Sequence, residues 1–279
     1  MSKQTCVATK LKQVVESLYN PKLADSWDNT GLLLQAPFSR AGAKSVLLTI
    51  DLTEKVADEA ISNKLVSSII TYHPIIFRGL KAITMEDSQQ RSLLRLAAEG
   101  IHVYSPHTCV DAAAEGVNDW LAWGIAGGKY QLKSSKPIQQ NAPMSEAEGY
   151  GRLCEFSQPA SLREVIERAK KLTGLPYVQV AAPKGLDASI SSVSVCAGSG
   201  GSVLAGTEAD LYFTGELSHH QILALIAKGV SVILCGHSNT ERGYLKDVMA
   251  EKLAKAFRES DVDAEILISA EDRDPLTVM

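Results

Sequence analysis

Residues 45–74 read SVLLTIDLTEKVADEAISNKLVSSIITYHP, and this stretch decides the fold class. Residues 45–52 are apolar with little alternation, as expected of a strand that is buried on both faces of a parallel sheet. The Ala-rich and acid-rich segment 54–63 predicts a helix, and the apolar run 65–70 predicts a second strand. The order strand, helix, strand indicates an α/β protein.

The same alternation extends in both directions along the chain. An amphipathic helix is predicted near the N-terminus, because apolar residues recur at helical spacing up to Asn20. The pattern Ser161-Leu-Arg-Glu164 is that of a capping box and predicts a helix to about residue 173. Other helices are predicted at 91–99, 117–123, 219–227 and 240–258, and other strands at 101–104, 177–182, 192–196, 210–214, 230–235 and 264–269.

The length of 279 residues favours two domains, since single domains cluster near roughly 100 to 200 residues. The stretch 127–151 is rich in Gly, Lys, Gln, Ser and Pro and interrupts the alternation. We therefore predict an N-terminal α/β domain at 1–130, a linker at 131–150 and a C-terminal α/β domain at 151–279. Both domains should have a central sheet flanked by helices.

The composition narrows the class of protein and its compartment. Lys and Arg number 28 against 32 Asp and Glu, without a basic block, which argues against direct nucleic-acid binding. No apolar run approaches the roughly 20 residues of a membrane helix. The five cysteines are an odd set without a C-x-x-C pair and indicate reduced thiols. We expect a cytoplasmic protein, with the nucleus or, given the basic start before Glu16, the mitochondrion as alternatives.

Three of the six histidines follow predicted strands, where open α/β sheets bind their ligands. His73 follows the strand at 65–70. His107 follows the strand at 101–104 and lies four residues before Asp111, and His237 lies four before Glu241. Residues four apart share one face of a helix, so each histidine and its acid could bind the same ligand.

These five side chains would suffice for two metal ions bridged by a carboxylate, about 3.5 to 4 Å apart. A shell of imidazole and carboxylate suits Zn, Mn, Fe, Co or Ni and does not decide among them. Such ions lower the pKa of a bound water, which predicts hydrolase chemistry. The alternative is that each histidine is structural and that Ser238-Asn-Thr-Glu241 is a capping box.

Other polar segments are weaker candidates. Glu216 follows the strand at 210–214 and could act as a general acid or base, while His219 and His220 could bind an anionic substrate. The alternative is a helix capped by Ser218.

The loop 197–202, Ala-Gly-Ser-Gly-Gly-Ser, could cradle an anion, supply Ser199 as a nucleophile or simply form a tight turn. Asp51 and the turn 27–31 are polar groups beside apolar strands. Within that turn, Asn29 either faces a ligand or closes the turn.

Five motifs in order resemble the NIF-three-like family, whose members are often labelled GTP cyclohydrolase 1 type 2 homologues. They are Ser26-Trp-Asp-Asn-Thr-Gly31, Tyr72-His-Pro74, His107-Thr-Cys-Val-Asp111, Thr214-Gly-Glu216 with His219-His220, and Gly236-His-Ser-Asn-Thr-Glu-Arg-Gly243. The resemblance implies two linked α/β domains with a two-metal site between them, assembled as a toroidal hexamer of dimers. It implies the ligands His73, His107, Asp111, His237 and Glu241, with Asp111 or Glu241 as the bridge.

The chain departs from the family pattern at Tyr72, where many bacterial relatives have a histidine. Tyr72 could ligate a metal or hydrogen-bond a bound water, and one of the two ions could bind weakly. The cyclohydrolase label of the family implies opening of the purine imidazole ring. Our leading hypothesis is a metal-dependent hydrolase, either GTP cyclohydrolase-like or acting on another nucleotide-like or phosphate-bearing metabolite, with metal-bound water as the nucleophile and Glu216 as auxiliary acid or base. The alternative is a non-enzymatic protein that handles metal or binds a partner, such as a transcriptional co-regulator.

Overall fold

The computed structural model describes residues 7–141 and 145–277, which form two compact α/β units. Unit 1 comprises Met1–Val110 and Leu245–Arg273, and unit 2 comprises Asp111–Tyr244 and Asp274–Met279. The predicted α/β class is confirmed. The units are interleaved along the chain, in contrast to the consecutive domains predicted at 1–130 and 151–279 with a linker between them.

Unit 1 contains a five-stranded sheet whose central strands are buried on both faces. The strand order is β1 (Gly31–Leu34), β4 (His102–Ser105), β3 (Val66–Thr71), β2 (Ser45–Thr49) and β11 (Glu265–Ile268). Neighbouring strands from β4 to β11 are parallel, and β1 is antiparallel to β4. Every residue of β2 and β3 is buried, which explains their continuous apolar runs. Residues that follow β2, β3 and β4 therefore lie at one edge of the sheet.

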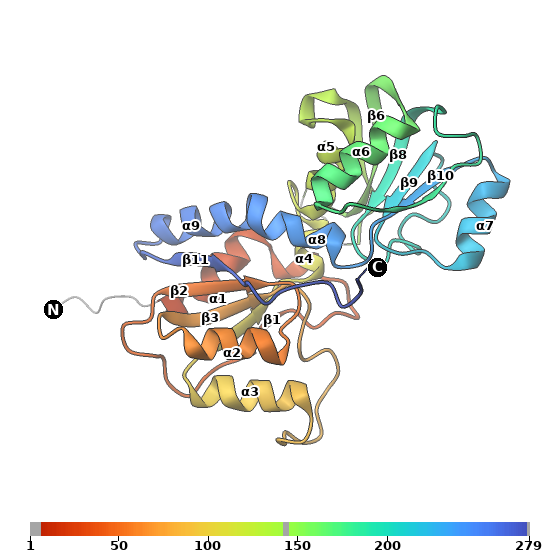
Figure 1. Cartoon of the computed structure of the whole chain (residues 1–279). Coiled ribbons are helices and arrows are strands. Elements are labelled where there is room, and N and C mark those ends of the chain that lie inside the picture. Colours follow the sequence, from red (N-terminus) through yellow and green to blue (C-terminus); the bar gives the residue numbers. More distant parts are fainter. Residues whose placement is uncertain (1–6, 142–144, 278–279) are drawn as a thin grey trace. The chain divides into compact units, whose positions relative to one another are not determined.

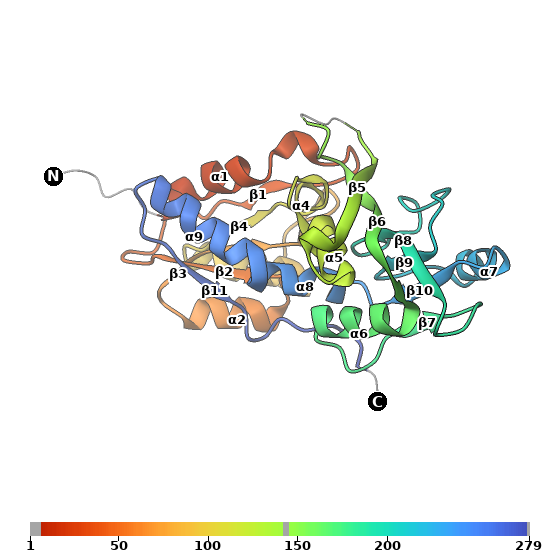
Figure 2. The same cartoon turned by 90° about the horizontal axis from the view of Figure 1, so that it is seen from above.

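Helices cover both faces of this sheet. On one face lie α2 (Glu54–Ser62) and α3 (Ser88–Ala98), and on the other α1 (Val7–Leu18) and α9 (Ala250–Glu259) lie side by side (Figures 1 and 2). A short 3-10 turn, η1 (Pro21–Leu23), follows α1. Thr53 and Asp87 cap the starts of α2 and α3 by accepting hydrogen bonds from backbone N–H groups three residues later.

After residue 244 the chain returns to unit 1, where it stays up to residue 273. The predicted helix 240–258 is present as α8 (Asn239–Tyr244), a π-helical turn η3 (Leu245–Met249) and α9, and the boundary between the units falls at residue 244. The strand that follows, β11, pairs in parallel with β2. Sequence periodicity indicates that α9 has an apolar face, at Leu253 and Phe257, but not which sheet that face covers.

Unit 2 contains a six-stranded mixed sheet. Its order is β5 (Leu132–Gln139), β6 (Tyr150–Ser161), β8 (Ser189–Cys196), β9 (Leu211–Thr214), β10 (Ser231–Leu234) and β7 (Gln179–Ala181). The strands β8, β9 and β10 are parallel, and the other pairings are antiparallel. One face is covered by α5 (Val117–Ala126) and α6 (Leu162–Thr173), and α7 (His219–Ala227) packs on the other (Figure 1).

Strand β5 of unit 2 falls in the segment that was predicted as a linker, and β6 begins at the last residue of that segment. β5 reads LKSSKPIQ, and none of its residues is buried, as expected of a strand at the edge of a sheet. It is preceded by the 3-10 turn η2 (Lys129–Gln131). Its partner β6 carries Arg152, which is buried. The polar composition of the segment hid β5, which needs no continuous apolar run. β6 was missed because it pairs a buried charge with a distant acid.

The predicted capping box is confirmed. Ser161 and Glu164 form a reciprocal capping box at the start of α6. Cys109, Cys154, Cys196 and Cys235 are buried free thiols, while Cys6 and the basic start at Lys3 lie outside the described residues. Within the described ranges, no helix combines the length and apolar character that a membrane span requires.

Candidate functional site

Polar side chains follow the parallel strands of unit 1 in a regular pattern. Asp51, His73 and His107 each lie two residues beyond the end of β2, β3 and β4, respectively. The rings of His73 and His107 have centroids 5.4 Å apart, with their planes at 80°. The sheet therefore brings these two predicted ligands together at the carboxyl ends of neighbouring strands, as their positions in the sequence predicted.

A carboxylate in unit 1 faces the Nδ1 atom of each ring. His73 Nδ1 lies 2.9 Å from Asp51 Oδ1, and His107 Nδ1 lies 2.8 Å from Asp28 Oδ1. An ionised carboxylate only accepts hydrogen bonds, so each Nδ1 carries the proton. Metal-binding histidines have this arrangement, because it fixes the tautomer that offers Nε2 to the metal. Sequence analysis noted Asp51 and the turn that holds Asp28, but it gave neither residue this role.

Asp28 is buried and held by several hydrogen bonds. Its side chain has no exposed surface, and its Oδ2 accepts hydrogen bonds from Thr108 N at 3.2 Å and Thr108 Oγ1 at 2.5 Å. Burial raises the pKa of the Asp28 carboxyl, but the hydrogen bonds to His107 and Thr108 and the charge of His107 outweigh burial and lower it. The residue it contacts, His107, has a left-handed backbone with φ of 31°.

The lowered pKa of Asp28 predicts a contribution to acid stability. A carboxyl whose pKa is lower in the folded state stabilises the fold above its ordinary pKa of 3.8, and this contribution is lost as the pH falls through the lowered value. Asp28→Asn should therefore unfold with a weaker dependence on pH below about 4 than the parent. Unfolding by urea at a series of acidic pH values measures this, and equal slopes for the two proteins would contradict it.

Tyr72 and Asn29 line the same part of unit 1. The buried Tyr72 ring is 5.5 Å from that of His73 and 6.0 Å from that of His107, edge to face with both. Its backbone carbonyl accepts a hydrogen bond from Ser105 Oγ. Asn29 Nδ2 donates to the carbonyl of Ile76 at 2.5 Å, so this side chain ties the turn 27–31 to the loop after β3. A direct role for either side chain in ligand binding stays a prediction.

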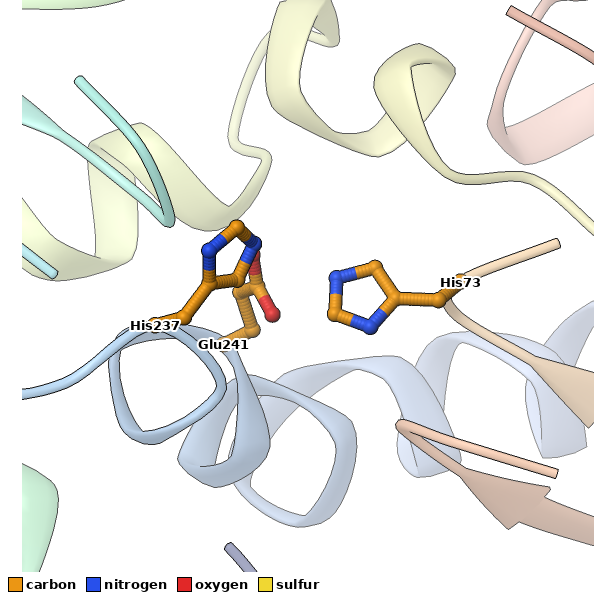
Figure 3. A group of neighbouring side chains, drawn as sticks. All are labelled: His73, His237 and Glu241. Atoms are coloured by element: carbon orange, nitrogen blue, oxygen red, sulfur yellow. The ribbon is translucent and has the colours of Figure 1, made fainter. Parts of the chain in front are cut away.

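The candidate site residues of unit 2 follow the strands β9 and β10. His237 lies three residues after β10, and Glu241 projects from the first turn of α8; Figure 3 draws both, together with His73 of unit 1. His237 Nε2 is 3.6 Å from Glu241 Oε1, and His237 Nδ1 is 2.8 Å from Glu216 Oε1. His237 thus has a carboxylate partner at Nδ1, as His73 and His107 do. The nearby backbone of Gly198 leaves no room for a side chain beside these atoms.

Asp111 belongs to α4 (Thr108–Ala112), and it is the first residue of unit 2. Its backbone carbonyl accepts a hydrogen bond from Asn118 Nδ2 at 3.0 Å. Burial raises the pKa of the Cys196 thiol, and the negative charges of Asp111 and Glu241 raise it further. Both predicted carboxylate ligands therefore lie near one buried thiol, whose neutral form their charges favour.

In the glycine-rich loop 197–202, two backbone amides already donate hydrogen bonds to side chains of unit 2. These two amides are therefore not open to bind an anion. Gly198 N donates to Thr240 Oγ1 at 2.8 Å, and Gly200 N donates to Thr214 Oγ1 at 3.1 Å. These bonds hold the loop against β9 and α8. Ser199 is exposed, and its proposed role as a nucleophile stays a prediction.

The two capping alternatives have different outcomes. Ser218 and Gln221 form a capping box that starts α7, and His219 and His220 stand exposed in its first turn. Ser238, by contrast, donates its hydroxyl proton to Asp274 and accepts a hydrogen bond from Arg242, so its hydroxyl has other partners than the helix start. Glu241 therefore contacts His237 and does not form a capping box with Ser238.

Two α/β units with histidine–carboxylate pairs beyond the ends of parallel strands define a candidate metal-binding protein. The chain belongs to the Duf34/NIF3 family (NGG1p interacting factor 3), whose model matches residues 7–275. It is 74% identical to the protein NIF3 homolog of Schizosaccharomyces pombe, over 98% of each chain. It is 42% identical to NGG1-interacting factor 3 of Saccharomyces cerevisiae, over 96% of each chain.

Solved structures share the fold at lower identity. A Bacillus cereus protein related to NIF3 matches with a TM-score of 0.82 at 20% identity, over 98% of this chain and 99% of that chain. Reduced HcgD from Methanocaldococcus jannaschii matches with a TM-score of 0.73 at 26% identity, over 94% of this chain and 96% of that chain. The resemblance found in the motifs is thereby confirmed at the level of family and fold.

Proposed function

We propose that this protein is a metal-dependent hydrolase that binds its metal ions through histidine and carboxylate side chains. The observation that carries this proposal is that three histidines each pair through Nδ1 with a carboxylate of their own unit. A single histidine–carboxylate pair is common in purely structural settings. Three such pairs, each on a histidine that is expected to bind metal, support a metal-binding role. The proposed ligands are His73, His107, Asp111, His237 and Glu241, and their side chains offer the atom types that hold transition metals.

Two divalent ions, from among Zn, Mn, Fe, Co and Ni, are proposed, with Asp111 or Glu241 as the bridge. Such ions polarise the group to be cleaved and activate water for attack on it. The protein's part is to present Nε2 of each histidine in a fixed orientation, which Asp28, Asp51 and Glu216 achieve by accepting the Nδ1 protons. Glu216 is half exposed, so its proposed role as auxiliary acid or base is compatible with its contact to His237.

An exposed aromatic surface in unit 1 supports a nucleotide-like substrate. Trp27 and Phe77 are 57% and 47% exposed, although large aromatic side chains are usually buried. Their ring centroids are 6.0 Å apart, and the Trp27 ring is 5.9 Å from that of His107. A planar base could stack on this surface while its phosphate approaches the metal donors.

A second candidate function is partner binding without catalysis. It is favoured by the name of the S. cerevisiae relative, NGG1-interacting factor 3, which is 42% identical over nearly the whole chain. We propose that this function would use a homo-oligomeric ring, hexameric by family resemblance, as the binding platform.

The first experiment is to measure the metal content of protein purified without an affinity metal, by elemental mass spectrometry. The parent should hold about two ions per chain, or about one if Tyr72 has emptied a position, and Asp111→Ala and His237→Ala should lose them with the fold retained. The parent should also hydrolyse a member of a panel of nucleotides and phosphate esters, and Asp111→Ala should not.

The alternatives give different results in the same experiment. A folded parent that takes up no metal after resupply with Zn, Mn and Fe would overturn the hydrolase proposal. Metal without turnover, together with partner binding that survives Asp111→Ala, would favour the second candidate.

A further inference from the structure

The three histidine–carboxylate pairs are not equivalent. The carboxylate side chain of Asp28 has no exposed surface, whereas those of Asp51 and Glu216 are 42% and 53% exposed. Asp28 also uses both oxygens, one toward His107 and the other toward Thr108. Its orientation is therefore fixed by two different groups.

We propose that Asp28 is the positioning residue that sets His107 in the Nδ1–H tautomer, so that Nε2 faces the metal. The inference deepens the proposed metal site and rests on it for the identity of the ligand, although the tautomer itself exists without metal. Asp28 acts through His107 and touches neither metal nor substrate in this role.

Hydrogen-bond donors around Asp28 make a specific prediction for its amide analogue. Thr108 N is a backbone donor that cannot reverse, and it lies 3.2 Å from Asp28 Oδ2. In Asp28→Asn the single oxygen must therefore face Thr108, and the NH2 group must face His107 Nδ1. His107 then accepts at Nδ1 and carries its proton on Nε2, where it cannot bind a metal.

The backbone around His107 agrees with this role. His107 has a φ of 31°, a conformation that non-glycine residues hold only when their surroundings impose it. Thr108 Oγ1 donates to Asp28 Oδ2 and accepts from Asp25 N at 3.1 Å, so residues 25–28 clamp the start of α4. The clamp links the turn before β1 to the histidine after β4, 79 residues away in sequence.

The other two pairs provide matched controls. Asp51→Asn and Glu216→Gln make the same change of carboxylate to amide beside His73 and His237. Because these side chains are partly exposed, water can solvate the new NH2 group when the amide oxygen faces Nδ1, which leaves the tautomer unchanged. Thr108→Val is a further control, since it removes the hydroxyl that donates to Asp28 but keeps the backbone donor and the contact between Asp28 and His107.

The test begins with metal-free protein labelled at histidine, because long-range proton–nitrogen NMR distinguishes the two neutral tautomers directly. His107 should be the Nδ1–H form in the parent, in Asp51→Asn, in Glu216→Gln and in Thr108→Val, and the Nε2–H form in Asp28→Asn. An Nε2–H form in the parent, or an Nδ1–H form in folded Asp28→Asn, would overturn the proposal. The parent measurement alone decides if the variant does not fold.

Metal affinity supplies the second readout. In competition with a chelator for Co²⁺ or Zn²⁺, Asp28→Asn should bind about 10- to 100-fold more weakly than the parent, and the three controls should change by less than about tenfold. Equal losses in Asp28→Asn and Thr108→Val would assign Asp28 a purely structural role and overturn the proposal. The NMR result is independent of turnover, so it stands or falls separately from the hydrolase function.

Discussion

Asp119→Ala is expected to lower the free energy of unfolding by about 3 to 5 kcal/mol, because it leaves the buried charge of Arg152 without its carboxylate. The Arg152 side chain is 2% exposed and forms a bidentate pair with Asp119, at 2.7 Å from Nε to Oδ1 and from Nη2 to Oδ2. Arg152 also donates to the backbone carbonyls of Gly149 and Gly151, which are neutral and cannot replace the lost charge.

Urea unfolding of the parent and the variant, followed by circular dichroism, measures the loss. Glu155→Ala is the matched control, since Glu155 lies on the same strand β6 and pairs with Lys133, but both of these side chains are more than half exposed. An exposed pair contributes little to stability, so the control should change the midpoint far less. Equal destabilisation by the two substitutions would show that the buried Arg152–Asp119 pair contributes no more to stability than an exposed ion pair.

Gly198→Ala is expected to weaken metal binding by about 10- to 100-fold while the fold is retained. A Cβ at Gly198 would lie 2.8 Å from Glu241 Oε1 and 2.9 Å from His237 Nε2, closer than atoms can approach. These atoms are the ends of side chains, so they can move aside, and the protein can fold. The displaced atoms are the proposed metal-binding atoms of unit 2, however, and their displacement removes the arrangement that a metal requires.

The control for this substitution is Gly206→Ala. Gly206 has a φ of 82°, comparable to the 59° of Gly198, but its Cβ would meet no atom within 4 Å. It therefore carries the cost of a left-handed alanine, about 1 to 2 kcal/mol, without the contact. Chelator competition should show parental metal affinity in Gly206→Ala and a loss in Gly198→Ala. Parental affinity in both variants would contradict the assignment of His237 and Glu241 as ligands.

Features that depend on neighbouring residues were predictable from the sequence. The parallel strands β2 and β3 and the helix between them follow from local apolar pattern, and Ser161 and Ser218 cap helices as their spacing indicates. His73 and His107 were expected at one sheet edge because each follows a strand, and their rings do lie together. These predictions succeed because periodicity and capping act over a few residues.

Features that depend on distant pairing were not predictable. β11 follows unit 2 in sequence but joins the sheet of unit 1, and β5 lies in a segment whose composition resembles a linker. Asp28 was one polar residue in a turn, and sequence reasoning chose its neighbour Asn29 as the residue that could face a ligand. No local signal distinguishes the two, because the partner of Asp28 is His107, on another element.

The sequence by itself determined the α/β class and the family, and it supplied the residues proposed to bind a metal, since these depend on residue type and short-range order. Only the tertiary structure decided which carboxylate fixes each imidazole, which strands complete each sheet and how closely Gly198 approaches His237 and Glu241. The physical reason is that hydrogen bonds and side-chain packing join atoms that are close in space, and the chain path that makes them close is set by burial across the whole fold.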